Sequence, residues 1–142
     1  MASTFQVTFD CANVDRMTKF WAVALGYIEQ PPPMGHDSWE AFATAVGIPE
    51  FEWDKMSALV DPEGVGPRVL FQKVPEDKTA KNRVHLDVNI GKAVPPEQRH
   101  AAVQRHVDKL VEAGADRVET IDEHGDHWVV MRDVEGNEFC VQ

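Results

Sequence analysis

The sequence has 142 residues, of which 43% are hydrophobic and 27% are charged, a composition typical of one globular domain. Its formal net charge of −10 repels phosphate backbones and anionic lipids, so nucleic-acid and membrane partners are not expected. No apolar run approaches the roughly 18 residues that cross a bilayer, and the first residues lack the pattern of a signal peptide. We therefore expect a cytoplasmic protein whose two cysteines, Cys11 and Cys140, are free thiols.

The chain is predicted to begin with a strand and a helix. Apolar and polar side chains alternate over residues 5–11, which predicts a half-buried strand. Asn13 is a favourable N-cap and Gly26 a favourable helix stop. Apolar residues recur between them at helical spacing, so one face of this helix should be buried. That face contains Met17, Phe20, Trp21 and Ala24.

A proline-rich stretch then begins a segment with a short second helix. Asp37 and Glu40 have the spacing of a capping box, and Gly47 ends the helical pattern. The elements expected after it are a strand over 56–60, a turn over 61–64, a strand over 68–74 and a polar linker over 75–82.

The second half repeats this order. Residues 83–90 alternate like 5–11, and Pro95 and Gly114 bracket a helix over 95–113. The apolar stripe of that helix contains Val103, Val107, Leu110 and Val111. Strands are expected over 117–121, 127–132 and 138–141, with a turn over 133–136.

Two sequence echoes indicate an internal duplication. Val7-Thr8-Phe9-Asp10 returns as Val84-His85-Leu86-Asp87, and Asp61-Pro62-Glu63-Gly64 returns as Asp133-Val134-Glu135-Gly136. The same order and similar spacing predict an α+β fold of two tandem βαβββ modules in a single domain, residues 1–142. The modules are expected to span 4–75 and 83–142, with an insertion at 31–55 in the first.

Several motifs outside the insertion follow the pattern of one known family. They are Asn13-Val14-Asp15-Arg16, Phe20-Trp21, Leu25-Gly26-Tyr27, Leu70-Phe71-Gln72-Lys73-Val74-Pro75-Glu76, Lys81-Asn82-Arg83-Val84-His85-Leu86-Asp87, and Asp133 to Val141. Together with the duplicated unit they resemble the vicinal oxygen chelate superfamily of glyoxalase I, extradiol dioxygenases, fosfomycin resistance enzymes and bleomycin-binding proteins. More narrowly, the chain is similar to a bacterial glyoxalase-like group. The resemblance implies sheets curled around a small-molecule pocket, and a homodimer.

The resemblance also implies four inward positions, which hold a divalent ion in the metal-dependent members. They fall on Gln6, Gln72, His85 and Cys140. Aligning the two halves on their shared aspartate instead places Thr8 opposite His85, and both assignments stay open. Two neutral amides, one imidazole and one thiol supply little charge, so no metal is expected here, with His85 the ligand if an ion binds.

Other polar residues are candidates for catalysis or binding. His85 with Asp87 is the expected acid–base pair of an enzyme. The stretch 124–127 is either a turn or, with His85 and Asp87, part of a metal-binding triad. His100 and His106 are expected on the surface of their helix. The residues expected to line the pocket are Gln6, Thr8, Trp39, Trp53, Gln72, His85, His127 and Cys140.

The aromatic residues of the insertion allow two interpretations. Trp39, Phe42, Phe51 and Trp53 are either buried core or the wall of a lid. We expect Trp39 or Trp53 to line the mouth of the pocket.

Three functions are compatible with these residues. The favoured one is a glyoxalase-like protein with a degenerate metal site that binds, sequesters or senses a small molecule. The alternative is a lyase or isomerase of glyoxalase type that uses His85 as acid, base or metal ligand. A structural subunit without pocket chemistry is the third.

Overall fold

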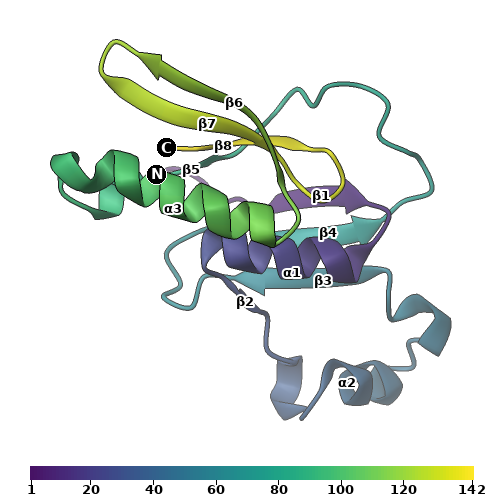
Figure 1. Ribbon diagram of the computed structural model, residues 1–142. Helices are drawn as coiled ribbons and strands as arrows, with labels where there is room; N and C mark the ends of the chain where they lie inside the picture. The colour runs from purple at the N-terminus through teal and green to yellow at the C-terminus, as the bar shows by residue number, and fades with distance from the viewer. The chain divides into compact units, whose positions relative to one another are not determined.

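The computed structural model describes all residues from Met1 to Gln142 (Figure 1). They divide into an N-terminal unit, residues 1–22 and 26–77, and a C-terminal unit, residues 23–25 and 78–142. None of the helices combines the length and the apolar character that spanning a bilayer requires.

The N-terminal unit is built on one open four-stranded sheet. Its strands lie in the order β1-β4-β3-β2, with β1 parallel to β4 and the other neighbours antiparallel. The elements in chain order are β1 (Val7–Cys11), α1 (Val14–Leu25), β2 (Ile28–Glu29), a 3-10 turn (Pro33–Gly35), α2 (Trp39–Val46), a second 3-10 turn (Glu50–Glu52), β3 (Met56–Val60) and β4 (Val69–Lys73).

The C-terminal unit has the same topology. Its sheet has the order β5-β8-β7-β6, again with the first strand parallel to the last. The elements are β5 (Asp87–Val88), 3-10 turns (Gly91–Ala93 and Pro96–Gln98), α3 (Arg99–Glu112), β6 (Asp116–Glu123), β7 (Asp126–Arg132) and β8 (Glu138–Val141). The predicted α+β fold of two tandem βαβββ modules is confirmed.

Helix α1 forms for the predicted reasons. The side-chain oxygen of Asn13 accepts the backbone N–H of Arg16 at 3.0 Å, and Gly26 ends the helix with a left-handed φ of 68°. The buried Trp21 ring lies 5.0 Å from the ring of Phe9 on β1. The four residues predicted for the apolar face, Met17, Phe20, Trp21 and Ala24, are all buried.

The two Asp-x-Glu-Gly turns are equivalent in structure as well as in sequence. The carboxylate of Asp61 accepts three backbone N–H groups, and that of Asp133 accepts two backbone N–H groups and the side-chain amide of Asn137. The N–H groups of Gly66 and Glu63 favour the charged form of Asp61, so they lower its pKa. Each turn joins the third strand of its module to the fourth.

The cap and the position of the inserted segment differ from the prediction. The hydroxyl of Ser38, not Asp37, caps α2 by accepting the N–H of Ala41 at 3.0 Å, because Ser38 is the extended residue that directly precedes the helix. The short strand β2 was not predicted, and it places the inserted segment inside the β2–β3 connection rather than directly after α1.

The first strand and the helix of the second module are shorter than predicted. Only Asp87–Val88 of the expected strand 83–90 forms a regular ladder, and Val84 is 80% exposed. A 3-10 turn precedes α3, so the helix begins at Arg99 rather than at Pro95. Val111 lies at the edge of the apolar face of α3 and is exposed, whereas Val103, Val107 and Leu110 are buried.

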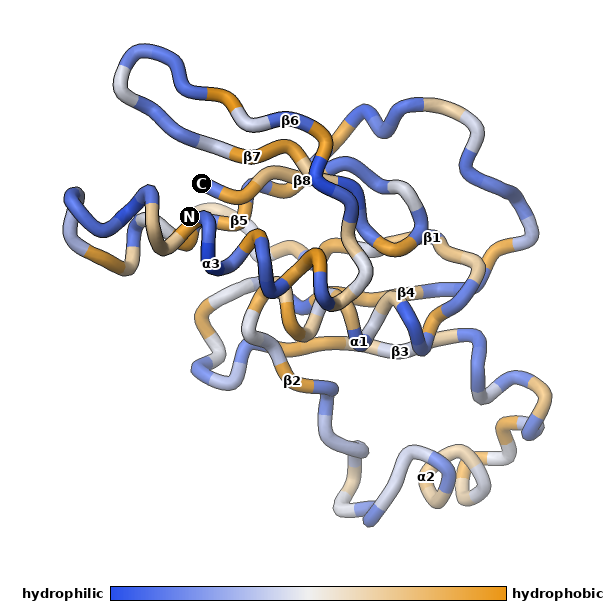
Figure 2. Tube along the Cα trace, viewed as in Figure 1, coloured by the Kyte–Doolittle hydropathy of each residue, from blue (hydrophilic) through white to orange (hydrophobic).

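Strands β6 and β7 form a long hairpin whose far end is hydrophilic (Figures 1 and 2). The two turn residues, His124 and Gly125, have φ values of 52° and 85°. Two successive positive φ values are typical of the type I′ turn, whose twist matches that of a hairpin. In the N-terminal unit the corresponding β2–β3 connection is residues 30–55, so the long hairpin belongs to the second module alone.

Candidate functional site

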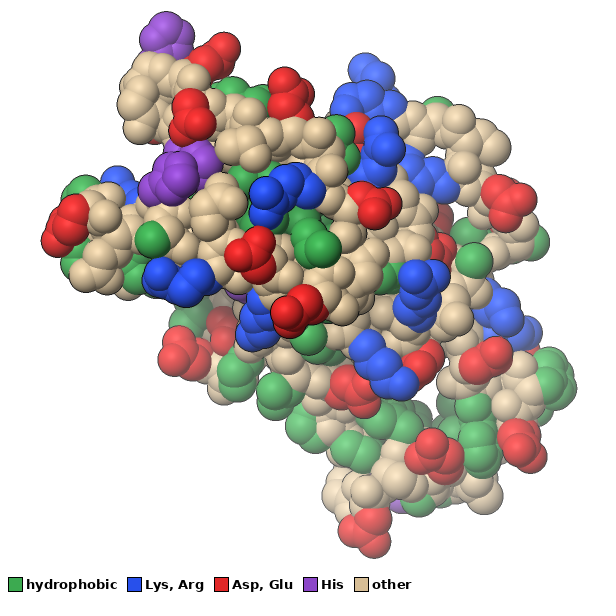
Figure 3. Space-filling view, viewed as in Figure 1, with side chains coloured by type: hydrophobic (Ala, Val, Ile, Leu, Met, Phe, Trp, Pro, Cys, Tyr) green, Lys and Arg blue, Asp and Glu red, His purple; other side chains and the backbone are tan.

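The C-terminal unit contains a hollow of about 970 Å³. Its walls come from the segment around β5, from β8, from the β6–β7 hairpin and from the start of α3. Histidine and acidic side chains gather over the hairpin and the start of α3 (Figure 3). The volume is that of a pocket for a small molecule. The lining includes His85, Asp87, Lys92, Arg99, His100, Asp122, His127 and Cys140.

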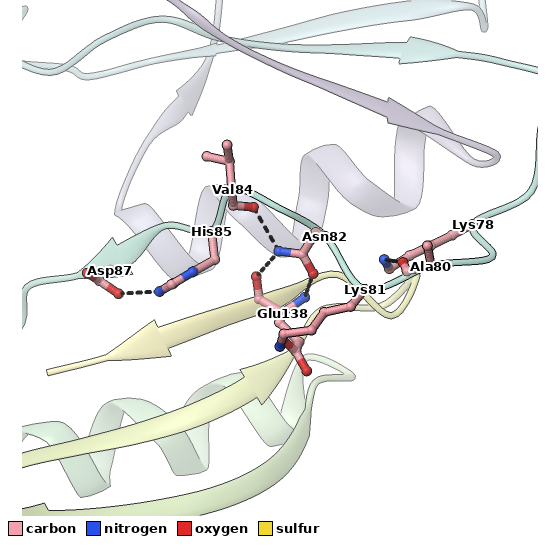
Figure 4. Close-up of polar contacts among 8 residues, drawn as sticks. All are labelled: Lys78, Ala80, Lys81, Asn82, Val84, His85, Asp87 and Glu138. Carbon is pink, nitrogen blue, oxygen red and sulfur yellow. Dashed lines mark hydrogen bonds and ion pairs between the residues drawn. The ribbon is translucent and has the colours of Figure 1, made fainter.

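Asn82 holds the irregular segment before β5 against β8 (Figure 4). Its amide nitrogen donates to the carbonyl oxygens of Val84 and Glu138, and its amide oxygen accepts the N–H of Glu138 at 2.9 Å. Lys81 forms an ion pair with the Glu138 carboxylate. These side-chain bonds replace the missing ladder and position His85 beside β8.

His85, Asp87 and Cys140 form the first group of candidate functional residues, termed the β5–β8 cluster. One ligand atom of each lies within 4.8 Å of the others. His85 Nε2 lies 3.3 Å from Asp87 Oδ1, and Asp87 pairs with Cys140 across the two strands. The cluster therefore combines an imidazole, a carboxylate and a thiol on one wall of the hollow.

The thiol of this cluster is held in its protonated form. Burial, and then the negative charge and hydrogen bond of Asp87, raise the pKa of Cys140 to about 11. A thiolate nucleophile needs a lowered pKa and an electropositive surrounding. Cys140 is therefore an uncharged group of the pocket wall at neutral pH.

The equivalent place in the N-terminal unit carries different side chains. Asp10 pairs with Gln72 across β1 and β4 as Asp87 pairs with Cys140 across β5 and β8. The Gln72 amide donates to the Asp10 carboxylate at 2.7 Å. This register makes Thr8, two residues before Asp10, the structural counterpart of His85.

Gln6 lies directly before β1 in the N-terminal unit, and its side chain is hydrogen-bonded to Arg68 and Thr8. The guanidinium of Arg68 donates to the side-chain oxygen of Gln6 at 3.0 Å, and the Gln6 amide donates to Thr8 at 3.4 Å. Gln6, Thr8 and Gln72 are thus predicted pocket residues of the N-terminal unit, whereas His85, His127 and Cys140 line the hollow of the C-terminal unit.

The residues at the family's four ligand positions do not suit a hard divalent ion. Gln6 and Gln72 offer neutral amides that are already hydrogen-bonded, and Thr8, the counterpart of His85, offers only a hydroxyl. Cys140 would have to lose a proton from a thiol with a pKa of about 11. Asp87 adds one carboxylate beside His85 and Cys140. Mixed nitrogen, oxygen and sulfur donors suit Zn²⁺ rather than Mg²⁺ or Mn²⁺.

His100, Asp122 and His127 form a second group, termed the hairpin cluster. Their ligand atoms also lie within 4.8 Å of one another. His100 is exposed on its helix, as predicted. His127, which the sequence grouped with His85 and Asp87, lies instead beside His100 and Asp122. The spacing of Asp122 and His127 on either side of a His-Gly turn was the signal that could have paired them.

Trp39 and Trp53 tie the inserted segment together. The indole N–H of Trp39 donates to the carbonyl of Gln30 at 2.7 Å, and that of Trp53 donates to the carbonyl of Ile48 at 3.0 Å. The Trp39 ring also packs edge-on against Phe42. Their predicted role at a pocket mouth stays a prediction.

Comparison with known proteins gives one family and one fold. A family model described as a glyoxalase-like domain matches residues 6–142. No curated protein sequence matches the chain.

Three solved structures illustrate the similarity in fold. A glyoxalase/bleomycin resistance protein/dioxygenase family enzyme from Burkholderia phytofirmans PsJN is 15% identical, with a TM-score of 0.63 over 99% of this chain and 97% of its own. The fosfomycin resistance protein FosX from Mesorhizobium loti is 11% identical, with a TM-score of 0.65 over 100% and 91%. A mutant of FosX from Listeria monocytogenes, complexed with Mn(II) and 1S,2S-dihydroxypropylphosphonic acid, is 10% identical, with a TM-score of 0.63 over 100% and 90%.

Proposed function

The chain belongs to the glyoxalase-like domain family, and on this premise we propose that its C-terminal pocket binds a small polar molecule without a metal at the family's ligand positions. The observation that carries the proposal is the β5–β8 cluster, in which a neutral thiol takes the place of an anionic ligand inside a hollow of about 970 Å³. Such a pocket can still recognise a ligand through hydrogen bonds and shape.

Two cationic and four acidic side chains line the hollow, and only the cationic pair favours an acidic group on the ligand; the carboxylates are Asp87, Asp122, Glu123 and Asp126. Lys92 and Arg99 both line it near the start of α3, and both offer cationic donors that suit carboxylate or phosphonate oxygens. On another wall, the carboxylate of Asp87 is an acceptor that suits hydroxyl or amide groups of a ligand. The phosphonic acid bound to the FosX mutant from Listeria monocytogenes is a ligand of this general kind.

A second candidate function, a lyase or isomerase, is favoured by the His85–Asp87 pair. The two groups lie 3.3 Å apart and both line the hollow. A carboxylate beside an imidazole can orient the ring and stabilise the cation that forms when the ring takes a proton from a substrate. In this scheme His85 is the base and Asp87 its positioning partner, and Cys140 remains a neutral wall group.

The experiment is an NMR titration of the ¹⁵N-labelled chain with small carboxylates and phosphonates, carried out in EDTA. We expect methylphosphonate or a dicarboxylate such as malonate to shift the signals of Asn89, Arg99 and Cys140 selectively. Arg99→Ala should weaken the response, whereas Arg105→Ala, an exposed arginine on the same helix, should leave it unchanged. Equal responses in both variants would contradict the proposed pocket.

Turnover separates the two candidate functions. A binding protein returns each probe unchanged, whereas an isomerase exchanges a substrate proton with deuterium from the solvent. If exchange is observed, His85→Gln should abolish it and retain binding. Exchange that persists in His85→Gln would rule out His85 as the base.

A further inference from the structure

The hairpin cluster is built from three elements of the C-terminal unit. Asp122 on β6 and His127 on β7 face each other across the ladder, and His127 Nδ1 lies 2.6 Å from Asp122 Oδ1. His100, in the first turn of α3, places its ring centroid 3.9 Å from that of His127, with the ring planes 34° apart. The His127 side chain is 12% exposed, so one member of the cluster is held in place by its surroundings.

We propose that His100, Asp122 and His127 bind a divalent transition-metal ion of the Zn²⁺, Co²⁺ or Ni²⁺ type. Two imidazoles and one carboxylate suit these ions, whereas Mg²⁺ and Ca²⁺ prefer oxygen ligands alone. A tetrahedral ion with bonds of about 2.0–2.2 Å needs ligand atoms about 3.3 Å apart. The ligand atoms already lie within 4.8 Å, and because His100 and Asp122 are exposed, their side chains are free to rotate toward the more buried His127.

Gln104 supplies the outer partner that a ligating histidine requires. Its side-chain amide lies 3.0 Å from His127 Nε2, on the side of the ring away from Asp122. When a metal replaces the proton between His127 Nδ1 and Asp122, the other ring nitrogen carries hydrogen and needs an acceptor. Rotation of the Gln104 amide presents its oxygen to that N–H, so the same contact serves both states.

This site is separate from the positions that the family uses for its metal. His85 and Cys140 belong to the segment before β5 and to β8, whereas the hairpin cluster uses α3 and the strands β6 and β7, toward the other edge of the sheet. Three protein ligands leave at least one coordination position for a molecule in the hollow, which both clusters line. The proposal does not depend on the ligand or the reaction proposed above.

The test is a titration of the EDTA-treated, dialysed full chain with Zn²⁺ by calorimetry and with Co²⁺ by absorption spectroscopy. We expect one ion per chain and cobalt d–d bands without a thiolate-to-cobalt charge-transfer band. His100→Ala and His127→Ala should each weaken binding by more than the roughly 10–100-fold that loss of an outer partner causes, and Gln104→Leu should fall within that range. Because His100 is exposed, His100→Ala tests the site even if His127→Ala unfolds the chain.

Three variants serve as controls. His85→Ala and Cys140→Ser should retain the metal, because they alter only the β5–β8 cluster. His124→Asn removes the imidazole of the hairpin turn with a residue that tolerates its positive φ, and it should also retain the metal. No stoichiometric binding, a thiolate band that Cys140→Ser removes, or equal affinity in His100→Ala would each overturn the proposal. The NMR titration with organic ligands is carried out in EDTA, so it tests the proposed function separately from these metal-binding results.

Discussion

The two units share a backbone plan but differ in the side chains that the plan presents. Each has a first strand parallel to its fourth, and each joins its third and fourth strands by an aspartate-centred turn. At the paired positions of the first and fourth strands, the N-terminal unit has Asp10 bound to Gln72, and the C-terminal unit has Asp87 beside Cys140. The shared aspartate is thus a feature of the duplicated fold, and its neighbours decide its chemistry.

The second difference lies in the connection between the second and third strands. A two-residue turn keeps β6 and β7 together over their whole length, so Asp122 and His127 meet. In the N-terminal unit only two residues of β2 pair with β3 before the chain leaves the sheet. The C-terminal module therefore has a continuous wall beside its hollow, whereas the N-terminal module has a separate segment in the same place.

Truncation of a buried aromatic side chain in each unit should lower stability most, and it tests whether both units depend on the same kind of core. Trp21 in the N-terminal unit and Phe139 in the C-terminal unit are fully buried. Trp21→Ala and Phe139→Ala should each lower the free energy of unfolding by about 3–5 kcal/mol, measured by urea denaturation. A loss below about 1 kcal/mol at either position would show that this residue does not hold its unit together.

The thiol that distinguishes the β5–β8 cluster should react slowly with alkylating agents. A pKa of about 11, against an ordinary value of 9.0, leaves Cys140 with about 100-fold less thiolate at pH 8, so alkylation by iodoacetamide should be slower by about that factor. Because the pKa is raised, this thiol's contribution to stability is full below pH 9 and is lost between pH 9 and about 11. Peptide mapping by mass spectrometry measures the rate at Cys140.

Asp87→Asn provides the matched variant for this measurement. It removes the negative charge that helps to raise the pKa of Cys140, so alkylation should become faster. An unchanged rate would leave burial as the whole cause.

Replacement of the aspartate in either Asp-x-Glu-Gly turn should have a smaller effect on the free energy of unfolding. Asp133 is 3% exposed, so Asp133→Ala should cost about 1–3 kcal/mol by leaving part-buried N–H groups without an acceptor. Asp61→Ala should cost less, because its turn is more open to water. Equal losses in urea denaturation would show that burial does not distinguish the turns.

The turn of Asp61 also predicts a pH dependence. The lowered pKa of Asp61 gives stability that is present above its unfolded pKa and is lost as the pH falls through its folded pKa. Asp61→Asn should therefore reduce the loss of stability on acidification, measured by urea denaturation at decreasing pH. A variant whose stability follows the same acid profile as the original chain would contradict this assignment.

The smallest effect is expected in the inserted segment. Trp39 is 39% exposed, and its indole bonds only to Gln30, the residue directly before the segment. The Trp53 indole bonds within the segment, to Ile48. Trp39→Ala and Trp53→Ala should therefore change the free energy of unfolding by less than about 1 kcal/mol, within the range usual for surface sites. Thermal unfolding that changes as much as in Trp21→Ala would make the segment part of the core.

Local patterns predicted the features of this fold that depend on neighbouring residues. The caps of α1 and the aspartate turns follow from side chains that bond within a few residues. The strand over 83–90 was predicted too long because Asn82, a side chain outside the alternating pattern, performs part of the pairing with β8. The β2 strand has only two paired residues, too few to leave a periodic signal.

The two candidate clusters also differ in how much of each could be predicted from local sequence patterns. His85 and Asp87 could be chosen from one strand because they lie two residues apart, on one face of an extended chain. The hairpin cluster joins a helix start to two strands, so it depends on the register of β6 with β7 and on where α3 begins. The helix was predicted to begin at residue 95, which would place His100 in its second turn rather than at its start. The sequence therefore did not indicate that His100 lies near the hairpin.

The two modules differ in how well they tolerate changes in chain length, because only the second has the two-residue His124–Gly125 turn between its second and third strands. In a ladder, a slip of one residue moves every following side chain to the opposite face. Unless a bulge absorbs it, as the ladder does between Arg117 and Glu119, one residue added to or removed from this turn would carry His127 away from Asp122 and dismantle the cluster while leaving its composition intact. The β2–β3 connection of the N-terminal unit already accommodates residues 30–55, so a change of length there leaves the register of its sheet unaffected.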